Sequence, residues 1–404
     1  MQKTTAEQMD ASRQFCPNLE CIARGKVGQG TIVSHGRKRP RYRCKTCGKT
    51  FSAKEGTMFA GLRKPTEVIV IVVTLLAYGC PIQAIVHAFG LDERTVASWR
   101  DRAGKQCEQV HQAIVEQGQL DLVHVQADEI RVKGRGRIVW MGLAMMVSTR
   151  LWLAGVISPS RDTALADRLL QQVRRCGQVL RAVLVCTDGW AAYPNSIRRA
   201  FREKVKVTAG RGRACLRVWP QLYIGTVIKR SVKKRVVEVT RRMAHGSAKR
   251  AAVLLRRSRG GSMLNTAFIE RFNGTMRERL ATLTRKCRHA ARRLEALHTG
   301  MYLIGCTYNF CWPHHELSKQ REGVVVTPAM AAGLTDHVWS LLELLSYKVA
   351  PAPWVVARRR RQPRARPCGE TLMPKRPRGR PRTRPLPDPT APKRPRGRPR
   401  KVAL

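Results

Sequence analysis

Acidic side chains are scarce in this chain of 404 residues. Asp and Glu number 27 against 77 Lys and Arg, which leaves a formal net charge of +50 at pH 7. Self-repulsion of that size opposes compaction unless a polyanion is bound. The composition therefore predicts nucleic acid as the partner, with an anionic membrane surface as the weaker alternative.

Long apolar runs are also lacking. The longest, Val68–Ala77, falls well short of the roughly 18–20 residues that cross a bilayer. The first residues are polar, so no signal peptide is expected. The 13 cysteines are odd in number and mostly scattered singly, which suits reduced thiols rather than a disulfide framework. We therefore expect a cytoplasmic, nucleoid-associated protein.

Four cysteines near the start of the chain form two closely spaced pairs. Four residues separate Cys16 from Cys21, two separate Cys44 from Cys47, and 22 lie between the pairs. In a reducing compartment this spacing predicts four thiolates around one structural Zn²⁺. The first pair is spaced more widely than the commonest zinc knuckle, and His35 is the alternative ligand.

The segment that follows predicts a helix-turn-helix. The apolar run 68–78 indicates a first helix that Gly79 ends, and Gly90 supplies a later turn. Asp92 is the expected N-cap of a third helix over 93–102. Four polar residues of this helix would face a DNA groove: Arg94, Ser98, Arg100 and Arg102. The alternative is an ordinary helical subdomain.

From residue 122 the pattern changes to strands. The expected order is strands at 123–128, 137–147 and 151–157, a helix at 163–173, and a strand at 179–187. Three strands, a helix and a fourth strand open a ribonuclease-H-like fold, in which the first and fourth strands are neighbours.

Three acids stand out on this framework. Asp128 ends the first strand, Asp188 ends the fourth, and Glu270 lies in 265–283, which has the apolar stripe of a helix. Neighbouring strands would bring Asp128 and Asp188 side by side. Glu129 is the alternative to Asp128, because only one of two successive strand residues is expected to face the cleft, and alternation favours Asp128.

Clustered carboxylates in so basic a chain suit phosphate chemistry. Two Mg²⁺ (or Mn²⁺) ions about 3.5–4 Å apart can activate a water or a 3′-hydroxyl and stabilise the leaving oxygen. Mg²⁺ takes carboxylate oxygens as ligands. We expect Asp128 to contact both ions, Asp188 one of them and Glu270 the other.

The last 54 residues are unlike the rest, since 13 are Pro and 18 are Lys or Arg. Such a composition predicts disorder. The octapeptide 375–382 recurs identically at 393–400. Its Arg-Gly-Arg-Pro core resembles the AT-hook, in which Gly lets the backbone enter the minor groove of A·T-rich DNA between flanking arginines. The expected contacts are Arg378, Gly379, Arg380, Arg396, Gly397 and Arg398.

Three blocks are similar to the signature blocks of DDE transposases from bacterial insertion sequences. They are Ala-Asp-Glu at 127–129, Cys-Thr-Asp-Gly-Trp-Ala-Ala-Tyr at 186–193, and Ile-Glu-Arg-Phe-Asn-Gly-Thr-Met-Arg at 269–277. The resemblance covers residues 16 to about 347 and is nearest to the group that begins with a zinc ribbon and a helix-turn-helix. It implies that Asp128, Asp188 and Glu270 are the metal-binding triad. It also implies that Asn273 and Arg277 support the site or hold DNA.

The expected architecture is an α/β ribonuclease-H-like catalytic domain preceded by a small zinc ribbon and an all-α helix-turn-helix. The expected boundaries are 1–62 for the ribbon, 63–118 for the helix-turn-helix, 119–347 for the catalytic domain with a basic insertion at about 201–262, and 348–404 for the disordered tail. The expected function is a Mg²⁺-dependent transposase, acting as a homodimer or larger assembly on double-stranded DNA. It would cut the inverted-repeat ends of a mobile element and join them to target DNA.

Two other functions are compatible with much of the sequence. A non-enzymatic DNA-binding regulator or architectural protein derived from a transposase would share every feature except the acid triad. A ribonuclease-H-like nuclease for RNA or hybrids would share the triad but differ in substrate.

Overall fold

The computed structural model describes residues 10–36, 41–134, 136–205, 214–233, 235–283 and 293–351. Residues 352–404 of the predicted tail, with both AT-hook copies, lie outside the described residues. Across these ranges no helix is both long enough and apolar enough to cross a membrane.

The N-terminal module is a small antiparallel sheet in the order β1-β2-β3, preceded by the short helix η1 (Ala11–Arg13). Its strands are β1 (Ile32–His35), β2 (Arg41–Cys44) and β3 (Thr50–Ser52). Tyr42 on β2 lies opposite Phe51 on β3, with ring centroids 5.7 Å apart. These rings and the cysteines form a core of their own.

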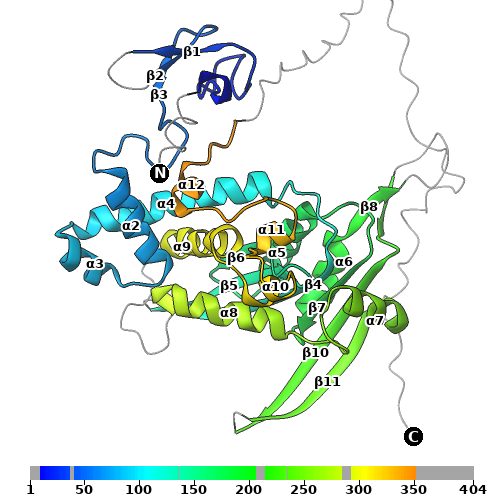
Figure 1. Cartoon of the computed structure of the whole chain (residues 1–404). Helices are drawn as coiled ribbons and strands as arrows, with labels where there is room; N and C mark the ends of the chain where they lie inside the picture. Colours follow the sequence, from blue (N-terminus) through cyan, green and yellow to red (C-terminus); the bar gives the residue numbers. More distant parts are fainter. Residues whose placement is uncertain are drawn as a thin grey trace, which may run out of the picture. The chain divides into compact units, whose positions relative to one another are not determined.

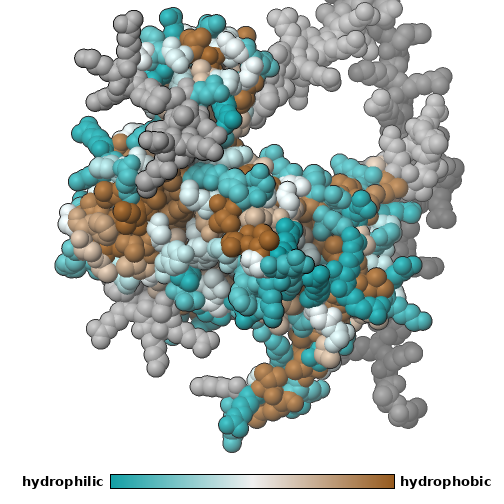
Figure 2. Space-filling view, viewed as in Figure 1, coloured by the Kyte–Doolittle hydropathy of each residue, from teal (hydrophilic) through white to brown (hydrophobic). Residues whose placement is uncertain are grey.

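Three helices follow: α2 (Thr66–Ala77), α3 (Ile82–Phe89) and α4 (Glu93–Ile114). Gly90 ends α3 in the left-handed conformation at φ 59°. The prediction that Asp92 caps the next helix is confirmed, since its carboxylate accepts the Arg94 N–H at 2.9 Å and the Thr95 N–H at 3.2 Å. Figure 2 shows apolar residues gathered over α2 and α3, where Ile71, Tyr78 and Phe89 are exposed.

The predicted end of the third helix at residue 102 is wrong, because α4 continues to Ile114. Its buried stripe runs on through Ala103, Cys107 and Val110, and this stripe packs against α9 (Leu294–Cys306). Apolar residues of α2 to α4 share one continuous core with the large sheet. The domain boundary at residue 118 stays a prediction.

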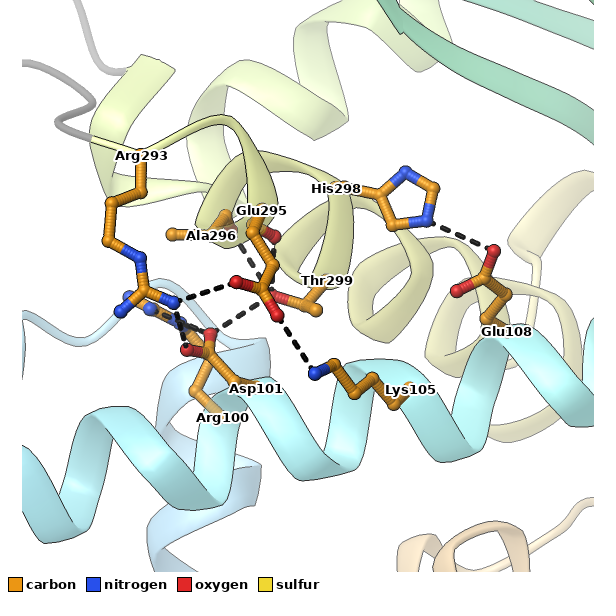
Figure 3. A network of polar contacts seen from close by, with 9 residues as sticks. All are labelled: Arg100, Asp101, Lys105, Glu108, Arg293, Glu295, Ala296, His298 and Thr299. Carbon is orange, nitrogen blue, oxygen red and sulfur yellow. Dashed lines mark hydrogen bonds and ion pairs between the residues drawn. The ribbon is translucent and has the colours of Figure 1, made fainter.

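Polar contacts fasten α4 to α9 as well (Figure 3). Asp101 accepts a hydrogen bond from the Thr299 hydroxyl at 3.0 Å, and Lys105 pairs with Glu295 at 2.8 Å. The helices approach so closely that a Cβ on Gly104 would lie 2.2 Å from the Thr299 carbonyl oxygen. This junction fixes the helical segment α2–α4 against α9, which packs on the large sheet.

A mixed sheet of six strands in the order β11-β10-β7-β4-β5-β6 forms the centre of the fold (Figure 1). The strands are β4 (Val123–Gly134), β5 (Arg137–Met146), β6 (Trp152–Ser158), β7 (Val183–Asp188), β10 (Leu222–Val232) and β11 (Arg235–His245). β7 is parallel to both β4 and β10, and the other pairs are antiparallel. The prediction that the first and fourth strands of this segment are neighbours is confirmed, with Ala127 opposite Thr187.

Two predicted features of the sheet are wrong. Asp128 does not end its strand, because β4 stays paired with β5 as far as Gly134 opposite Arg137. The segment 201–262 is not simply an insertion, because β10 is an integral strand that continues the sheet beyond β7. The sequence around Val227 predicts only a short strand because the second half of β10 is exposed and basic. In the structure that half pairs only with β11.

Helices cover both faces of this sheet. α5 (Thr163–Cys176) packs on one face, where Leu165 and Leu169 contact Gly142 of β5. α7 (Ala248–Arg257), α8 (Ala267–Arg279) and α9 pack on the other. α6 (Ala192–Ala200) follows β7 and packs on α5. The strand residues between these layers are almost all buried, which accounts for their apolar runs.

The remaining elements are short. They are β8 (Arg202–Val205) paired with β9 (Cys215–Val218), η2 (Ala281–Leu283), the π-helix η3 (Thr307–Cys311), α10 (His315–Lys319), α11 (Pro328–Ala331) and α12 (Leu341–Ser346). The helix predicted over 265–283 is interrupted at Leu280, which is extended. α9 and η3 together span most of the C-terminal helical region.

The π-helix η3 carries a buried polar anchor for the edge strand β6. The Asn309 side chain accepts the Trp152 N–H and donates to the Trp152 carbonyl, both at 2.9 Å. Asn309→Ala leaves both buried backbone groups without partners, so we expect the free energy of unfolding to fall by about 3 kcal/mol or more. Urea denaturation measures this, and the exposed Asn195→Ala serves as the control. A loss equal to that of the control would contradict the anchoring role.

Candidate active site

The four N-terminal cysteines converge on one point. Their sulfurs all lie within 4.8 Å of one another, with 3.7 Å between Cys16 and Cys47 and 3.9 Å between Cys21 and Cys44. Four thiolates around one ion at the Zn–S distance would have edges of about 3.8 Å. All four thiols are free, and His35, the alternative ligand, is not in the group. The cluster could therefore hold a metal ion.

A second group of possible metal ligands lies where β4 meets β7. The ladder between these strands runs to Ala127 and Thr187, and the next residue on each strand is an acid, Asp128 and Asp188. Asp128, Asp188 and Glu270 all line a pocket of about 510 Å³. The structure therefore brings the three predicted residues to one cavity from β4, β7 and α8.

Gln126 positions the helix that carries Glu270. Its side-chain oxygen accepts the N–H groups of Phe268 and Ile269, both at 3.0 Å, and its amide donates to the Asn265 carbonyl at 2.8 Å. These contacts satisfy free N–H groups at the start of α8. Gln126 and Asp128 are two residues apart on one face of β4, so the strand that carries one acid also fixes the helix that carries another.

Asp128 lies half-buried beside α8. The Asn273 amide donates to one carboxylate oxygen at 2.8 Å, and the Glu129 N–H donates to the other at 2.8 Å. Burial raises the pKa of Asp128 to about 6, with a further contribution from the negative charges of Asp188 and Glu270. Desolvation and repulsion both oppose ionisation, which a bound cation would relieve.

Glu129 is part of the acidic group, although of the two successive acids only Asp128 lines the pocket, as the alternation predicts. Its carboxylate lies within 4.8 Å of those of Asp128 and Asp188. The two side chains leave opposite faces of β4, but the β7 ladder stops beside them, so both reach Asp188 around its end. The Tyr193 hydroxyl donates to Glu129 at 2.8 Å. Burial, followed by the charge of Asp188, raises the pKa of Glu129 to about 7.

Glu270 lines the same pocket but lies outside this close group. The Thr266 hydroxyl donates to its carboxylate at 2.6 Å, and Lys229 of β10 forms an ion pair with it. On the other side of the pocket Arg161 forms ion pairs with Glu129 and Asp188. Sequence patterns did not identify Arg161, Lys229 or Gln126, because no local spacing marks a residue whose partner lies on a distant element.

The residues predicted to bind DNA are divided in the structure. Arg94 and Ser98 are exposed on the first turns of α4. Arg100 pairs with Asp101 at 2.8 Å and is mostly buried, and Arg102 donates to the Met58 carbonyl at 3.1 Å. The predicted orientation of Arg102 toward a DNA groove is therefore wrong, because its side chain turns toward the backbone of Met58. Asn273 is buried on Asp128, and the AT-hook residues lie outside the described residues.

Arg277 belongs to the same helix as Glu270. Its positive charge acts on Asp128 and lowers the pKa of that carboxyl, against the larger effect of burial. This effect on the pKa agrees with the predicted role of Arg277 in supporting the acidic site. Direct contact of Arg277 with DNA stays a prediction.

No protein-family model matches this chain, and no curated protein is significantly similar to it. Conclusions about its function therefore rest on the chemistry of the two clusters and the pocket. The acidic group joins residues from β4 and β7, with α8 closing one side. Converging carboxylate oxygens of this kind could hold a metal ion.

The raised pKa of Asp128 generates a pH-dependent prediction. A carboxyl whose pKa is about 6 when folded favours the folded state at low pH, and this stability is lost as the pH rises through that value. Without divalent ions, Asp128→Asn should therefore increase the free energy of unfolding by about 2 kcal/mol near pH 8 and by little near pH 4. Urea denaturation at both pH values measures the difference.

Asp162→Asn is the matched control of opposite sign. Asp162 caps α5, and the Ser160 hydroxyl and the Leu165 N–H lower its pKa. Its ionised form stabilises the folded state, so this variant should lose stability near neutral pH relative to acid. An Asp128→Asn effect of equal size at both pH values would refute the proposed cost of ionising Asp128.

Proposed function

We propose that this chain is a DDE transposase, which binds the ends of a mobile element, cuts a DNA strand at each end and joins the freed ends to target DNA. The observation that carries the proposal is the convergence of Asp128, Asp188 and Glu270 on one pocket. The strand order β6-β5-β4-β7-β10, antiparallel for the first three strands and parallel for the rest, supports a ribonuclease-H-like assignment. The three sequence blocks named above supply the same residues.

The pocket suits Mg²⁺ or Mn²⁺, because its ligands are hard carboxylate oxygens. Asp128 and Asp188 would hold the ions, with Glu270 and Glu129 as further ligands. When bound, two such ions would supply Lewis-acid activation of a water or a 3′-hydroxyl and stabilisation of the leaving oxygen.

Other residues of the chain keep these ligands in place. Asn273 orients the Asp128 carboxylate, and Tyr193 holds Glu129 by a hydrogen bond. Gln126 fixes the start of α8 and with it Glu270. Asp188 accepts the Trp190 N–H at 3.0 Å, which directs one of its oxygens. Support of this kind is what keeps metal ligands in a productive arrangement.

DNA is the substrate class that fits the charge of the chain. The exposed start of α4, with Arg94 and Ser98, would contact the element ends, and the tail would contact A·T-rich minor grooves. Transfer by direct attack of a 3′-hydroxyl needs no ATP. Since two element ends must be cut together, a dimer or larger assembly on DNA is proposed.

The cysteine cluster is proposed to hold one structural Zn²⁺, since its sulfur separations match a tetrahedral thiolate site. We expect the purified chain to contain about one zinc ion, as four thiolates complete a structural site. Cys44→Ser combined with Cys47→Ser should remove it, which elemental analysis by mass spectrometry measures. Cys215→Ser, at an exposed thiol outside the cluster, is the control. Full zinc content in the double variant would exclude this site.

Cleavage itself is tested with a plasmid that carries the DNA flanking the gene. We expect nicking that requires Mg²⁺ or Mn²⁺, and Asp188→Asn should slow it by about a hundredfold or more, because it removes a metal ligand. Asp121→Asn makes the same chemical change at a surface acid paired with Arg257 and should leave the rate unchanged. Gel electrophoresis of the supercoiled and nicked forms gives both rates.

Two results would count against the enzyme. If no divalent ion supports nicking, or if Asp188→Asn nicks as fast as the unmodified chain, the non-enzymatic DNA-binding regulator is the better description. If an excess of RNA–DNA hybrid abolishes nicking and is itself cut, the nuclease alternative is favoured over the transposase.

A further inference from the structure

Two basic side chains of the pocket are bound to its carboxylates. Arg161 stands between β6 and α5 and forms ion pairs with Glu129 and, at 3.3 Å, with Asp188. Lys229 reaches Glu270 from β10. Both cations line the pocket together with Asp188 and Glu270. In the free protein, therefore, cations of the chain itself neutralise the group that would hold a metal.

The carboxylates do not depend on these cations alone. Each one also accepts a hydrogen bond from an uncharged donor. The donors are the Trp190 N–H for Asp188 at 3.0 Å, the Tyr193 hydroxyl for Glu129 at 2.8 Å, and the Thr266 hydroxyl for Glu270 at 2.6 Å. If Arg161 and Lys229 change partners, each carboxylate therefore keeps at least one hydrogen bond.

Arg161 is also held by two aromatic rings. Its guanidinium carbon lies 4.6 Å from the centre of the Trp190 ring and 5.3 Å from that of Trp140. Stacking keeps a guanidinium in place while leaving its N–H groups available for other acceptors. The Arg161 side chain is 34% exposed, so its outer edge meets solvent at the pocket mouth.

Phosphate oxygens are the acceptors that would compete for these two groups. A guanidinium donates two parallel hydrogen bonds to a phosphate, and an ammonium binds it as a point charge. A DNA strand that entered the pocket would bring its phosphates close to Arg161 and Lys229, which both line it. The Lys229–Glu270 pair is partly exposed on both sides and contributes little to stability. The buried Glu129 carboxylate keeps its hydrogen bond from the Tyr193 hydroxyl when Arg161 changes partner.

We propose that Arg161 and Lys229 bind phosphates of the entering DNA strand and exchange their carboxylate partners for them, so that DNA releases the acids to bind metal. The proposal rests on the function proposed for this pocket. Metal and DNA then bind cooperatively. Because binding free energies are linked, metal raises the affinity for DNA by the same factor as DNA raises the affinity for metal.

The test measures Mn²⁺ binding to the full-length chain, with and without a duplex oligonucleotide, from the electron paramagnetic resonance signal of free Mn²⁺. Duplex alone and Asp128→Asn combined with Asp188→Asn give the background binding. The pocket variant is Arg161→Gln with Lys229→Gln. The matched control is Arg257→Gln with Lys105→Gln, which removes the same charge from ion pairs of 2.7 and 2.8 Å outside the pocket.

In the unmodified chain we expect duplex to raise the affinity for Mn²⁺. Without duplex, the pocket variant should bind Mn²⁺ about three- to tenfold more tightly, as expected from removing two partly exposed competing cations. It should gain little more when duplex is added. The control should match the unmodified chain in both measurements.

The proposal is overturned if the pocket variant binds Mn²⁺ no more tightly than the control, or if duplex still raises its affinity fully. Lys229→Gln alone is a second variant in case the double variant does not fold. Its partner Glu270 is 45% exposed, so loss of this ion pair should leave the fold intact. Nicking is a separate readout. If duplex raises the affinity for Mn²⁺ but no nicking occurs, the exchange is supported and the transposase is refuted. If nicking occurs but duplex does not change the affinity for Mn²⁺, the transposase is supported and the exchange is refuted.

Discussion

The pairing of β4 with β7 is the constraint on which the candidate site depends. It is a parallel ladder that runs to Ala127 and Thr187, and the next residue on each strand is an acid. Because β4 continues beyond this point with only β5 beside it, the carboxylates of Asp128 and Glu129 can approach Asp188 around the end of β7. A shift of one residue in this register would turn each of these side chains to the opposite face.

The pocket concentrates acids in a chain that has few. Ionising Asp128 and Glu129 is opposed by burial and by neighbouring negative charges, and the charge of Arg161 offsets part of that cost at Glu129. Arg161 and Lys229 are well suited to phosphate. Acids suited to a metal and bases suited to phosphate therefore line one cavity, and under the proposed exchange each set would limit how strongly the other binds its ligand.

The segment α2–α4 and the segment that contains the large sheet are joined through α4 and α9. Their shared apolar face and the polar contacts between Asp101, Lys105, Thr299 and Glu295 place the proposed DNA-binding end of α4 on the same rigid helix that supports the sheet. DNA held at Arg94 would thus be held at a fixed position on the molecule that contains the pocket. The length of α4 is what makes this possible, and its apolar periodicity beyond residue 102 indicates that length.

The sequence alone determined whatever depends on residues close together in the chain. The spacing of the cysteines predicted their cluster, and local sequence predicted the cap at Asp92 and the turn at Gly90. The order of strands and helix predicted that the strands of Asp128 and Asp188 are neighbours. Tertiary structure decided the rest. The cap that Gln126 provides to α8, the approach of Glu129, and the pairing of Arg161 and Lys229 with the acids each join side chains far apart in sequence. Such contacts depend on strand register and on where ladders end, which local periodicity does not encode.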